Sequence, residues 1–264
     1  IFLVSFLSLK EWLSNDSNNN GWFYTSWLLN LKGPLGHMTR LIIFLTLFLI
    51  PLVHPISKTF LFLFCIVLTF WICLTSISIL HKDSIDKEKI TFSNHTFGFF
   101  LILNFYWISI LFIGNSEQLL MSPYIIFLFI LLNTAIFDIF AYLVGSKIGQ
   151  NYIFSTISPK KTLEGLLGGF FGVILFSTLL TGYLDYFYFG EASNFIYLTI
   201  LISIIGGFFA FTGDLVISHL KRKAGIKDTG DILPGHGGVL DRVDSHLIAA
   251  PVLIILIVFA SSQL

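Results

Sequence analysis

The chain has 264 residues, of which 55% are hydrophobic and only 11% are charged, and its fifteen Lys and Arg residues are balanced by fifteen Asp and Glu residues. Such a composition excludes a water-soluble domain, because too few polar groups remain to cover the apolar surface. It predicts an integral membrane protein, and no nucleic-acid partner is expected.

The apolar segments in chain order predict an all-α, polytopic bundle of transmembrane helices. The opening run IFLVSFLSLKEWL has about nine apolar residues before Lys10, whereas a helix needs about 20 to cross the hydrocarbon core. We therefore expect a truncated helix at the N-terminus. Seven further spans are predicted at 41–53, 59–80, 97–113, 123–144, 164–183, 195–217 and 245–261. Cys65 and Cys73 lie within one of these spans and are interpreted as packing or lipid-facing residues.

The basic residues predict the topology of these spans. Nearly all Lys and Arg residues fall in four connections, which alternate with connections that have almost none. The basic connections are expected to face the cytoplasm. We divide the chain into N-terminal membrane helices at 1–122, the first of them truncated, and a catalytic membrane domain at 123–264 with cytoplasmic loops at 145–163 and 218–244.

Two carboxylates lie inside apolar spans. Asp138 is about seven residues, or roughly 10 Å, from the cytoplasmic end of its span, and a carboxylate there needs a partner or a polar cavity. It is either part of a functional site or a neutral buried residue bonded to another helix. Asp214 shares a helical stripe with Gly207 and Ala210, so we expect it to point into the bundle, away from lipid.

Asp241 and Asp244 are spaced to lie on one side of a helix that begins there. One of them is alternatively a helix N-cap, which would leave the other without a role. Together with Asp214 they lie near the cytoplasmic face, where the three side chains could converge on a divalent cation. Carboxylate oxygens favour Mg²⁺ or Ca²⁺ over zinc.

The connection before the span at 164–183 combines Ser158, Lys160, Lys161 and Thr162 directly ahead of a helix start. Free backbone amides, lysines and hydroxyls suit a phosphate, although lysines beside a span also serve simply as topology determinants. His236, within Pro-Gly-His-Gly-Gly, is placed either to orient a phosphate or ribose or to structure the loop.

The polar run between the last two spans carries a longer pattern, namely Ser218, Lys221-Arg222, Lys227-Asp228, His236-Gly237-Gly238 and Asp241-Arg242-Val243-Asp244. Two further blocks accompany it, Asp138 and the segment from Ser158 to Gly165 that includes Glu164. In these residues the chain resembles the integral-membrane phosphatidate cytidylyltransferases, also called CDP-diacylglycerol synthases. The resemblance covers about residues 135–260.

The resemblance implies that CTP and phosphatidic acid condense to CDP-diacylglycerol and pyrophosphate. It implies Mg²⁺ held by Asp214, Asp241 and Asp244, with K⁺ nearby. The implied catalytic residues are Asp214, Asp241, Asp244, Lys221 and Arg222. The implied substrate-binding residues are Asp138, Ser158, Lys160, Lys161, Thr162, Glu164, Ser218, Lys227, Asp228, His236 and Arg242.

The expected location is the bacterial inner membrane, with the active site on the cytoplasmic side and membrane lipid around the helices. A homodimer is one assembly that this allows. Two other functions remain open. The first is a CTP-dependent transferase acting on an ether lipid or a polyprenol, since the sequence defines nucleotide transfer better than acyl identity. The second is a transporter, which would also explain carboxylates inside spans.

Overall fold

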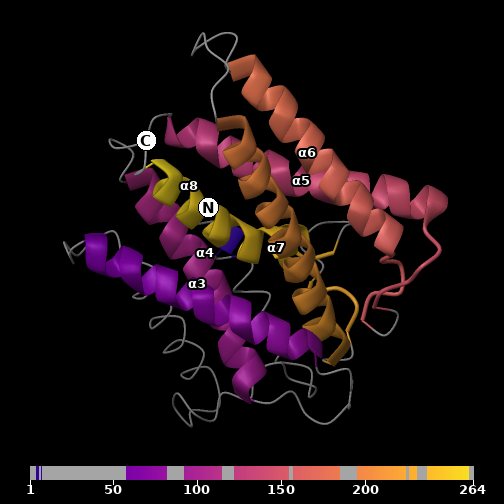
Figure 1. The fold of residues 1–264 in the computed structure, drawn as a ribbon. Helices are drawn as coiled ribbons and strands as arrows, with labels where there is room; N and C mark the ends of the chain where they lie inside the picture. The colour runs from indigo at the N-terminus through magenta and orange to yellow at the C-terminus, as the bar shows by residue number, and fades with distance from the viewer. Residues whose placement is uncertain are drawn as a thin grey trace.

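The structure is a computed structural model, and it describes residues 4, 5, 7, 58–81, 92–114, 122–154, 157–184, 195–223, 226–230 and 237–261. This part of the chain is mainly helical, as predicted, and holds no β-strand, while Tyr152 and Thr162 pair in an isolated bridge. Figure 1 shows the helices, which are α3 (Lys58–His81), α4 (Phe92–Gly114), α5 (Pro123–Ile148), α6 (Leu163–Leu184), α7 (Phe195–Lys223) and α8 (Leu240–Ser261).

Four of the described helices, α5 to α8, are long and apolar enough to cross a membrane. The described parts of α3 and α4 contribute shorter apolar stretches, at 62–76 and 100–112. These features are those of an integral membrane protein. The expected span at 41–53 and the truncated first helix lie outside the described residues, so the count of seven spans stays a prediction.

Two helices extend further into polar sequence than the apolar windows predicted. Helix α7 continues to Lys223 and α8 begins at Leu240, whereas we expected their spans to end at 217 and to begin at 245. Hydropathy marks where apolar side chains stop, but Lys and Arg are good helix formers and allow the helix to continue. Several residues that we expected in a loop therefore lie on helices, and the helix determines the direction in which each side chain points.

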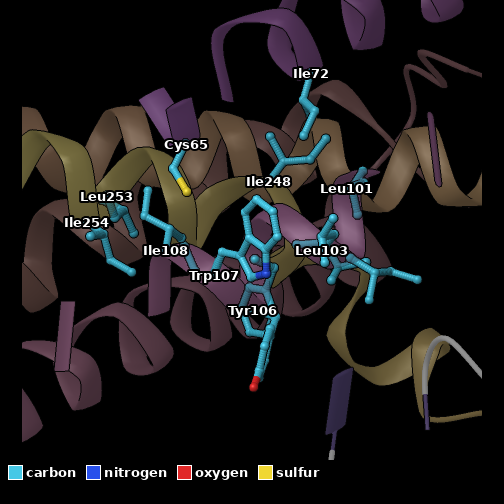
Figure 2. Close-up of a cluster of buried hydrophobic side chains, with 14 of the residues drawn as sticks. Cys65, Ile72, Leu101, Leu103, Tyr106, Trp107, Ile108, Ile248, Leu253 and Ile254 are labelled. Carbon is cyan, nitrogen blue, oxygen red and sulfur yellow. The ribbon is translucent and has the colours of Figure 1, made fainter. Parts of the chain in front are cut away.

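The described interior holds two hydrophobic clusters, and the larger one joins both halves of the chain. Buried side chains of α3 and α4 form a continuous hydrophobic cluster with those of α7 and α8. Figure 2 shows Trp107 and Ile108 of α4 among Cys65 of α3 and Leu253 of α8. Outward-facing residues of α3, α5 and α6 include many large apolar side chains, as expected where helices meet lipid. The division of the chain at residue 122 stays a prediction.

Helix α6 packs against α5 through small residues. A Cβ on Gly168 would lie 2.5 Å from Val144, one on Gly169 2.7 Å from Phe137, and one on Gly172 2.5 Å from Phe140. Any larger side chain would push the helices apart, so these glycines allow α5 and α6 to pack closely. This close crossing fixes the relation between the end of α5 and the start of α6.

Polar side chains also link helices within the apolar interior. Asn104 of α4 donates a hydrogen bond to the Thr69 hydroxyl of α3 at 2.8 Å, and Asn133 of α5 donates to the Ser203 carbonyl of α7 at 3.3 Å. Where no water is present, such bonds favour one arrangement of the helices. The bundle therefore offers a defined frame for the charged residues at the ends of α5, α7 and α8.

Candidate functional site

The described residues of the connection between α5 and α6, 149–154 and 157–162, bring its two ends together. Tyr152 pairs with Thr162 in an isolated antiparallel bridge. The Thr162 hydroxyl accepts a hydrogen bond from the Gly165 amide at 3.2 Å and so caps the first turn of α6. Thr162 is almost fully buried. The hydroxyl that we expected at a phosphate therefore holds the start of the helix.

Glu164 fastens the same connection from the other side. Its Oε2 accepts the backbone amides of Gln150 at 3.1 Å and Asn151 at 3.2 Å, and its Oε1 accepts the Asn151 side chain at 2.6 Å. Both carboxylate oxygens are thus engaged within the connection, although we expected Glu164 to bind substrate. The bonds give the segment that carries Lys160 and Lys161 a defined path between the two helices.

Lys161 reaches from this connection to α7. Its Nζ lies 2.7 Å from Asp214 Oδ2 and 4.5 Å from the centroid of the Phe211 ring. The carboxylate and the aromatic face both attract the ammonium group. Ser218, one turn further along α7, donates to Asp214 Oδ1 at 3.1 Å. Asp214 therefore points into the bundle, as its stripe of small residues predicted, and it has two partners there.

Asp241 anchors the segment between α7 and α8. Its Oδ1 lies 2.8 Å from Lys221 Nζ, while its Oδ2 accepts the amides of Thr229 at 2.8 Å and Gly238 at 3.0 Å. Gly237 has a φ of +80°, which favours glycine, and a Cβ there would lie 3.0 Å from Asp241 Oδ2. Because α8 begins one residue before Asp241, this aspartate lies within the first turn and is not the N-cap.

Asp138 of α5 and Asp244 of α8 lie near the carboxylate of Asp214. The Ser245 hydroxyl of α8 donates to Asp138 Oδ2 at 2.8 Å, and the Ser245 amide donates to Asp244 Oδ1, also at 2.8 Å. Both carboxylates lie within the electrostatic reach of Asp214. The hydrogen bond from Ser245 agrees with Asp138 as a buried residue bonded to another helix. The position of Asp138 near Asp214 agrees with Asp138 as part of a functional site. Both interpretations remain open.

We call these six side chains the charged cluster: Asp138, Lys161, Asp214, Lys221, Asp241 and Asp244. Lys161 acts electrostatically on Asp138 as well as on its ion-pair partner, and Lys221 likewise acts on Asp244. Four carboxylates thus face two ammonium groups. The cluster therefore holds more carboxyl groups than ammonium groups, and carboxyl oxygens are ligands that suit a hard cation.

The donor chemistry of the cluster fits a hard divalent cation, since every donor is a carboxylate oxygen. Within the described ranges, however, no three side chains among the His, Cys, Asp and Glu residues form a group arranged to hold a metal ion. Two of the three expected ligands contact lysines instead, at 2.7 and 2.8 Å. The magnesium site at Asp214, Asp241 and Asp244, and the potassium ion beside it, stay predictions.

The remaining expected site residues are distributed as follows. Arg222 donates to the Ile226 carbonyl at 3.4 Å, which brings the segment after α7 back toward that helix. Ser158 is partly exposed within the α5–α6 connection. The expected residues that stand exposed are Lys160, Lys227, Asp228 and Arg242. His236 lies outside the described residues.

The sequence reasoning missed three residues that shape the cluster. Phe211 precedes Asp214 by three positions, so helical spacing alone would have put it on the same face. Gly213 allows α7 and α8 to meet, because a Cβ there would lie 2.7 Å from the Asp244 carbonyl oxygen. Ser245 follows Asp244 directly, but no local signal pairs it with α5.

Comparison with known proteins finds a matching family and several similar bacterial proteins. The family model described as "Cytidylyltransferase family" matches residues 1–260. The phosphatidate cytidylyltransferase of Staphylococcus haemolyticus (strain JCSC1435) is 40% identical over 121 residues, covering 46% of this chain and 44% of the relative. The phosphatidate cytidylyltransferase of Staphylococcus epidermidis (strain RP62A) is 39% identical over 135 residues, covering 51% of this chain and 49% of the relative.

A third relative is the Escherichia coli (strain K12) uncharacterized protein YnbB, which is 37% identical over 154 residues, covering 55% of this chain and 49% of the relative. In each of these alignments the chain spans about half the length of the relative, or slightly less. All three relatives are bacterial.

Proposed function

Because the chain belongs to the cytidylyltransferase family, we propose that it is a phosphatidate cytidylyltransferase, which joins CTP to phosphatidic acid and releases pyrophosphate. The observation that carries the proposal is the meeting of Lys161 and Lys221 with carboxylates of α7 and α8 beside long apolar helices. Cations and carboxylates together suit a reaction between phosphates, and the apolar helices suit a lipid substrate. The names of the two staphylococcal relatives support the same choice.

The proposed reaction exchanges the group attached to the α-phosphorus of CTP. A phosphate oxygen of phosphatidic acid attacks that phosphorus, the bond to the oxygen bridging the α- and β-phosphates breaks, and pyrophosphate departs with that bridging oxygen. A phosphomonoester is already largely ionised near neutral pH, so the attack needs no strong general base. The main obstacle is the repulsion between two polyanions, and catalysis therefore rests on positioning and charge neutralisation.

The cations of the site are proposed to meet these phosphates. Lys221, Arg222 and Lys227 hold phosphates on the α7 side, and Lys160 and Lys161 complete the nucleotide or lipid-phosphate site from the α5–α6 connection. Thr162 and Glu164 support that connection through the contacts described above. Their role in this proposal is to keep the two lysines in place.

A divalent cation, Mg²⁺ in this proposal, supplies neutralisation of phosphate charge when it is bound. Asp214, Asp241 and Asp244 are the side chains proposed to hold it, and a potassium ion nearby is part of the same proposal. The excess of carboxylates over lysines in the charged cluster supports a cation there.

We place the reaction at the cytoplasmic face of a bacterial inner membrane. The distribution of Lys and Arg along the sequence supports this orientation, and the bacterial relatives support the choice of membrane. In this setting the acyl chains of the substrate stay in the bilayer while its phosphate reaches the charged cluster.

A direct assay tests the substrate. Membranes that contain the full chain receive Mg²⁺, CTP labelled at the α-phosphate and one of three lipids, namely phosphatidic acid, an ether lipid or a polyprenol. We expect labelled CDP-diacylglycerol and an equal amount of pyrophosphate with phosphatidic acid alone. Product with only one of the other lipids would move the assignment to that lipid. Substrate uptake by sealed vesicles without CTP turnover would replace it by a transporter.

The first variant to test is Asp214→Asn. We expect CDP-diacylglycerol formation to fall by roughly 100-fold or more, as is typical when one preorganised electrostatic group is removed, and we expect Asp241→Asn to act in the same direction. Tyr197→Phe, at the exposed opposite end of α7, controls for expression and insertion. Near-normal activity of both aspartate variants would contradict the metal assignment.

A further inference from the structure

Each of two carboxylates proposed to hold the metal already has a lysine as its partner. Lys161 Nζ lies 2.7 Å from Asp214, and the two side chains are 17% and 30% exposed. Lys221 Nζ lies 2.8 Å from Asp241, and these side chains are 11% and 7% exposed. Both pairs are therefore largely shielded from water, where ion pairs are stronger and less screened than at a free surface.

A lysine at this distance and a divalent cation compete for the same carboxylate. Mg²⁺ binds a carboxylate oxygen at about 2.0–2.1 Å, and an ammonium group at hydrogen-bond distance from the same carboxylate repels it. One cation must withdraw before the other binds well. In the arrangement described here, Lys161 and Lys221 take positions at Asp214 and Asp241 that a metal ion would need.

We propose that Lys161 and Lys221 act as placeholders, which neutralise Asp214 and Asp241 in the empty protein and exchange these carboxylates for substrate phosphates when a metal–nucleotide complex arrives. The exchange conserves ion pairing, because the metal replaces the lysine at the carboxylate and the phosphate replaces the carboxylate at the lysine. This inference rests on the proposed function in taking CTP as the nucleotide and Asp214 and Asp241 as metal ligands.

The structure allows Lys161 to change partner without moving its backbone. The α5–α6 connection is fixed on one side by Thr162 and on the other by Glu164. The lysine stem is flexible and its ammonium group has three rotatable donors. Phe211 lies beneath the ammonium at 4.5 Å, so the cation retains one attractive contact while it leaves Asp214.

The consequence is a coupling between metal and nucleotide. Metal alone must displace a lysine before any phosphate is present to receive it, so its affinity is low. Nucleotide supplies that partner and raises the affinity for metal, and by reciprocity metal raises the affinity for nucleotide by the same factor. Removing the placeholder should therefore strengthen the binding of metal alone and weaken the coupling.

The test measures Mn²⁺ binding by the purified full chain without lipid or nucleotide, from the electron paramagnetic resonance signal of free Mn²⁺. We expect Lys161→Met to bind Mn²⁺ about tenfold more tightly than the unchanged chain, which lies within the usual range of coupling between sites. The matched control is Lys160→Met, which removes the same charge from the adjacent, exposed position. We expect it to change Mn²⁺ affinity less than twofold, an effect in the range of a weak surface charge interaction.

The binding of labelled CTP, measured with and without Mn²⁺, supplies the second readout. Mn²⁺ should strengthen CTP binding to the unchanged chain more than to Lys161→Met. Equal gains in Mn²⁺ affinity for Lys160→Met and Lys161→Met would show a general charge effect and overturn the proposal, as would no gain in Lys161→Met. If Lys161→Met does not fold, Lys221→Met provides the same comparison at Asp241.

The outcome is separable from that of the proposed function. The Mn²⁺ titration uses neither lipid nor turnover, so a chain that makes no CDP-diacylglycerol can still show a gain specific to Lys161. That result would support the placeholder role of Lys161 and contradict the assignment of phosphatidic acid as the substrate. A chain that makes CDP-diacylglycerol but shows no such gain keeps its function and loses the placeholder.

Discussion

At Asp138 the cost of placing a carboxylate inside an apolar helix is offset by a hydroxyl from a different helix. Ser245 Oγ of α8 donates to Asp138 Oδ2 at 2.8 Å. Without that donor the carboxyl group would keep fewer partners in a largely dehydrated position, and an unsatisfied buried polar group is destabilising. This contact therefore contributes to holding α5 and α8 together beside the charged cluster.

We expect Ser245→Ala to lower the free energy of unfolding by about 1–3 kcal/mol, because Asp138 loses a buried hydrogen-bond donor. Thermal unfolding of the purified chain in detergent measures the effect. Ser146→Ala is the matched control, since the Ser146 hydroxyl is exposed and bonds only within its own helix, to the Leu143 carbonyl. Equal loss in both variants would contradict a specific role for Ser245.

The need for such a partner could be predicted from sequence, but its identity could not. A carboxylate in an apolar run signals that something must satisfy it. Ser245, however, is 107 positions away from Asp138, and the two meet only because α5 and α8 pack together. The same limit applies to the pairing of Lys161 with Asp214, for which the sequence indicated both residues but not their contact.

At the scale of helices, α7 and α8 approach each other closely beside the charged cluster. A Cβ on Gly213 would lie 2.7 Å from the Asp244 carbonyl oxygen and 3.2 Å from that of Ser245. Both neighbours are backbone atoms, which cannot turn aside as a side chain can. Gly213 thus keeps Asp214 of α7 and Asp244 of α8 near one another.

Gly213→Ala should separate α7 from α8 and destabilise the chain by about 1–3 kcal/mol, the usual cost of overpacking. Gly182→Ala is the control, because no atom lies within 4 Å of a Cβ at Gly182 of α6. In that position alanine should be neutral or slightly stabilising, owing to its higher helix propensity. The two melting temperatures in detergent measure the difference, and a destabilisation no larger at position 213 would show that the approach is not tight.

The apolar windows located the described helices well but not their polar ends. All six described helices coincide with predicted spans, since long apolar runs have few other stable conformations in a membrane. The end of α7 was misjudged because Ser218 and Lys221 are polar yet helical, whereas a helix that begins at Asp241 was expected. The rotation of each helix about its own axis determines which of these polar residues face one another. That rotation cannot be predicted from the sequence of a single span.

Across the whole molecule, the two ends of α5 should lie on opposite sides of the membrane. The helix runs for 26 residues from Pro123 to Ile148, which is long enough to cross the hydrocarbon core. Ser122 precedes its start, and Lys147 lies in its last turn. Both residues are exposed and therefore suitable for chemical labelling.

We expect a membrane-impermeant maleimide to label Lys147→Cys only where the cytoplasmic side is accessible, as in inverted vesicles, and to label Ser122→Cys in intact cells. The unchanged chain supplies the background, since its two cysteines lie within α3. Labelling with the opposite sidedness would reverse the topology. It would also move the charged cluster to the outer face, away from cytoplasmic CTP.

The ion pair between Lys161 and Asp214 also has a consequence for biogenesis. A charged aspartate is costly in a helix that enters the bilayer, by about 2.5–3.5 kcal/mol at its centre on insertion scales. The α5–α6 connection is synthesised before α7, so the neutralising lysine is already at the membrane when Asp214 emerges. The residue that partners Asp214 in the folded protein can thus also assist the insertion of α7, and loss of Lys161 would lower the yield of correctly inserted chains before any substrate is bound.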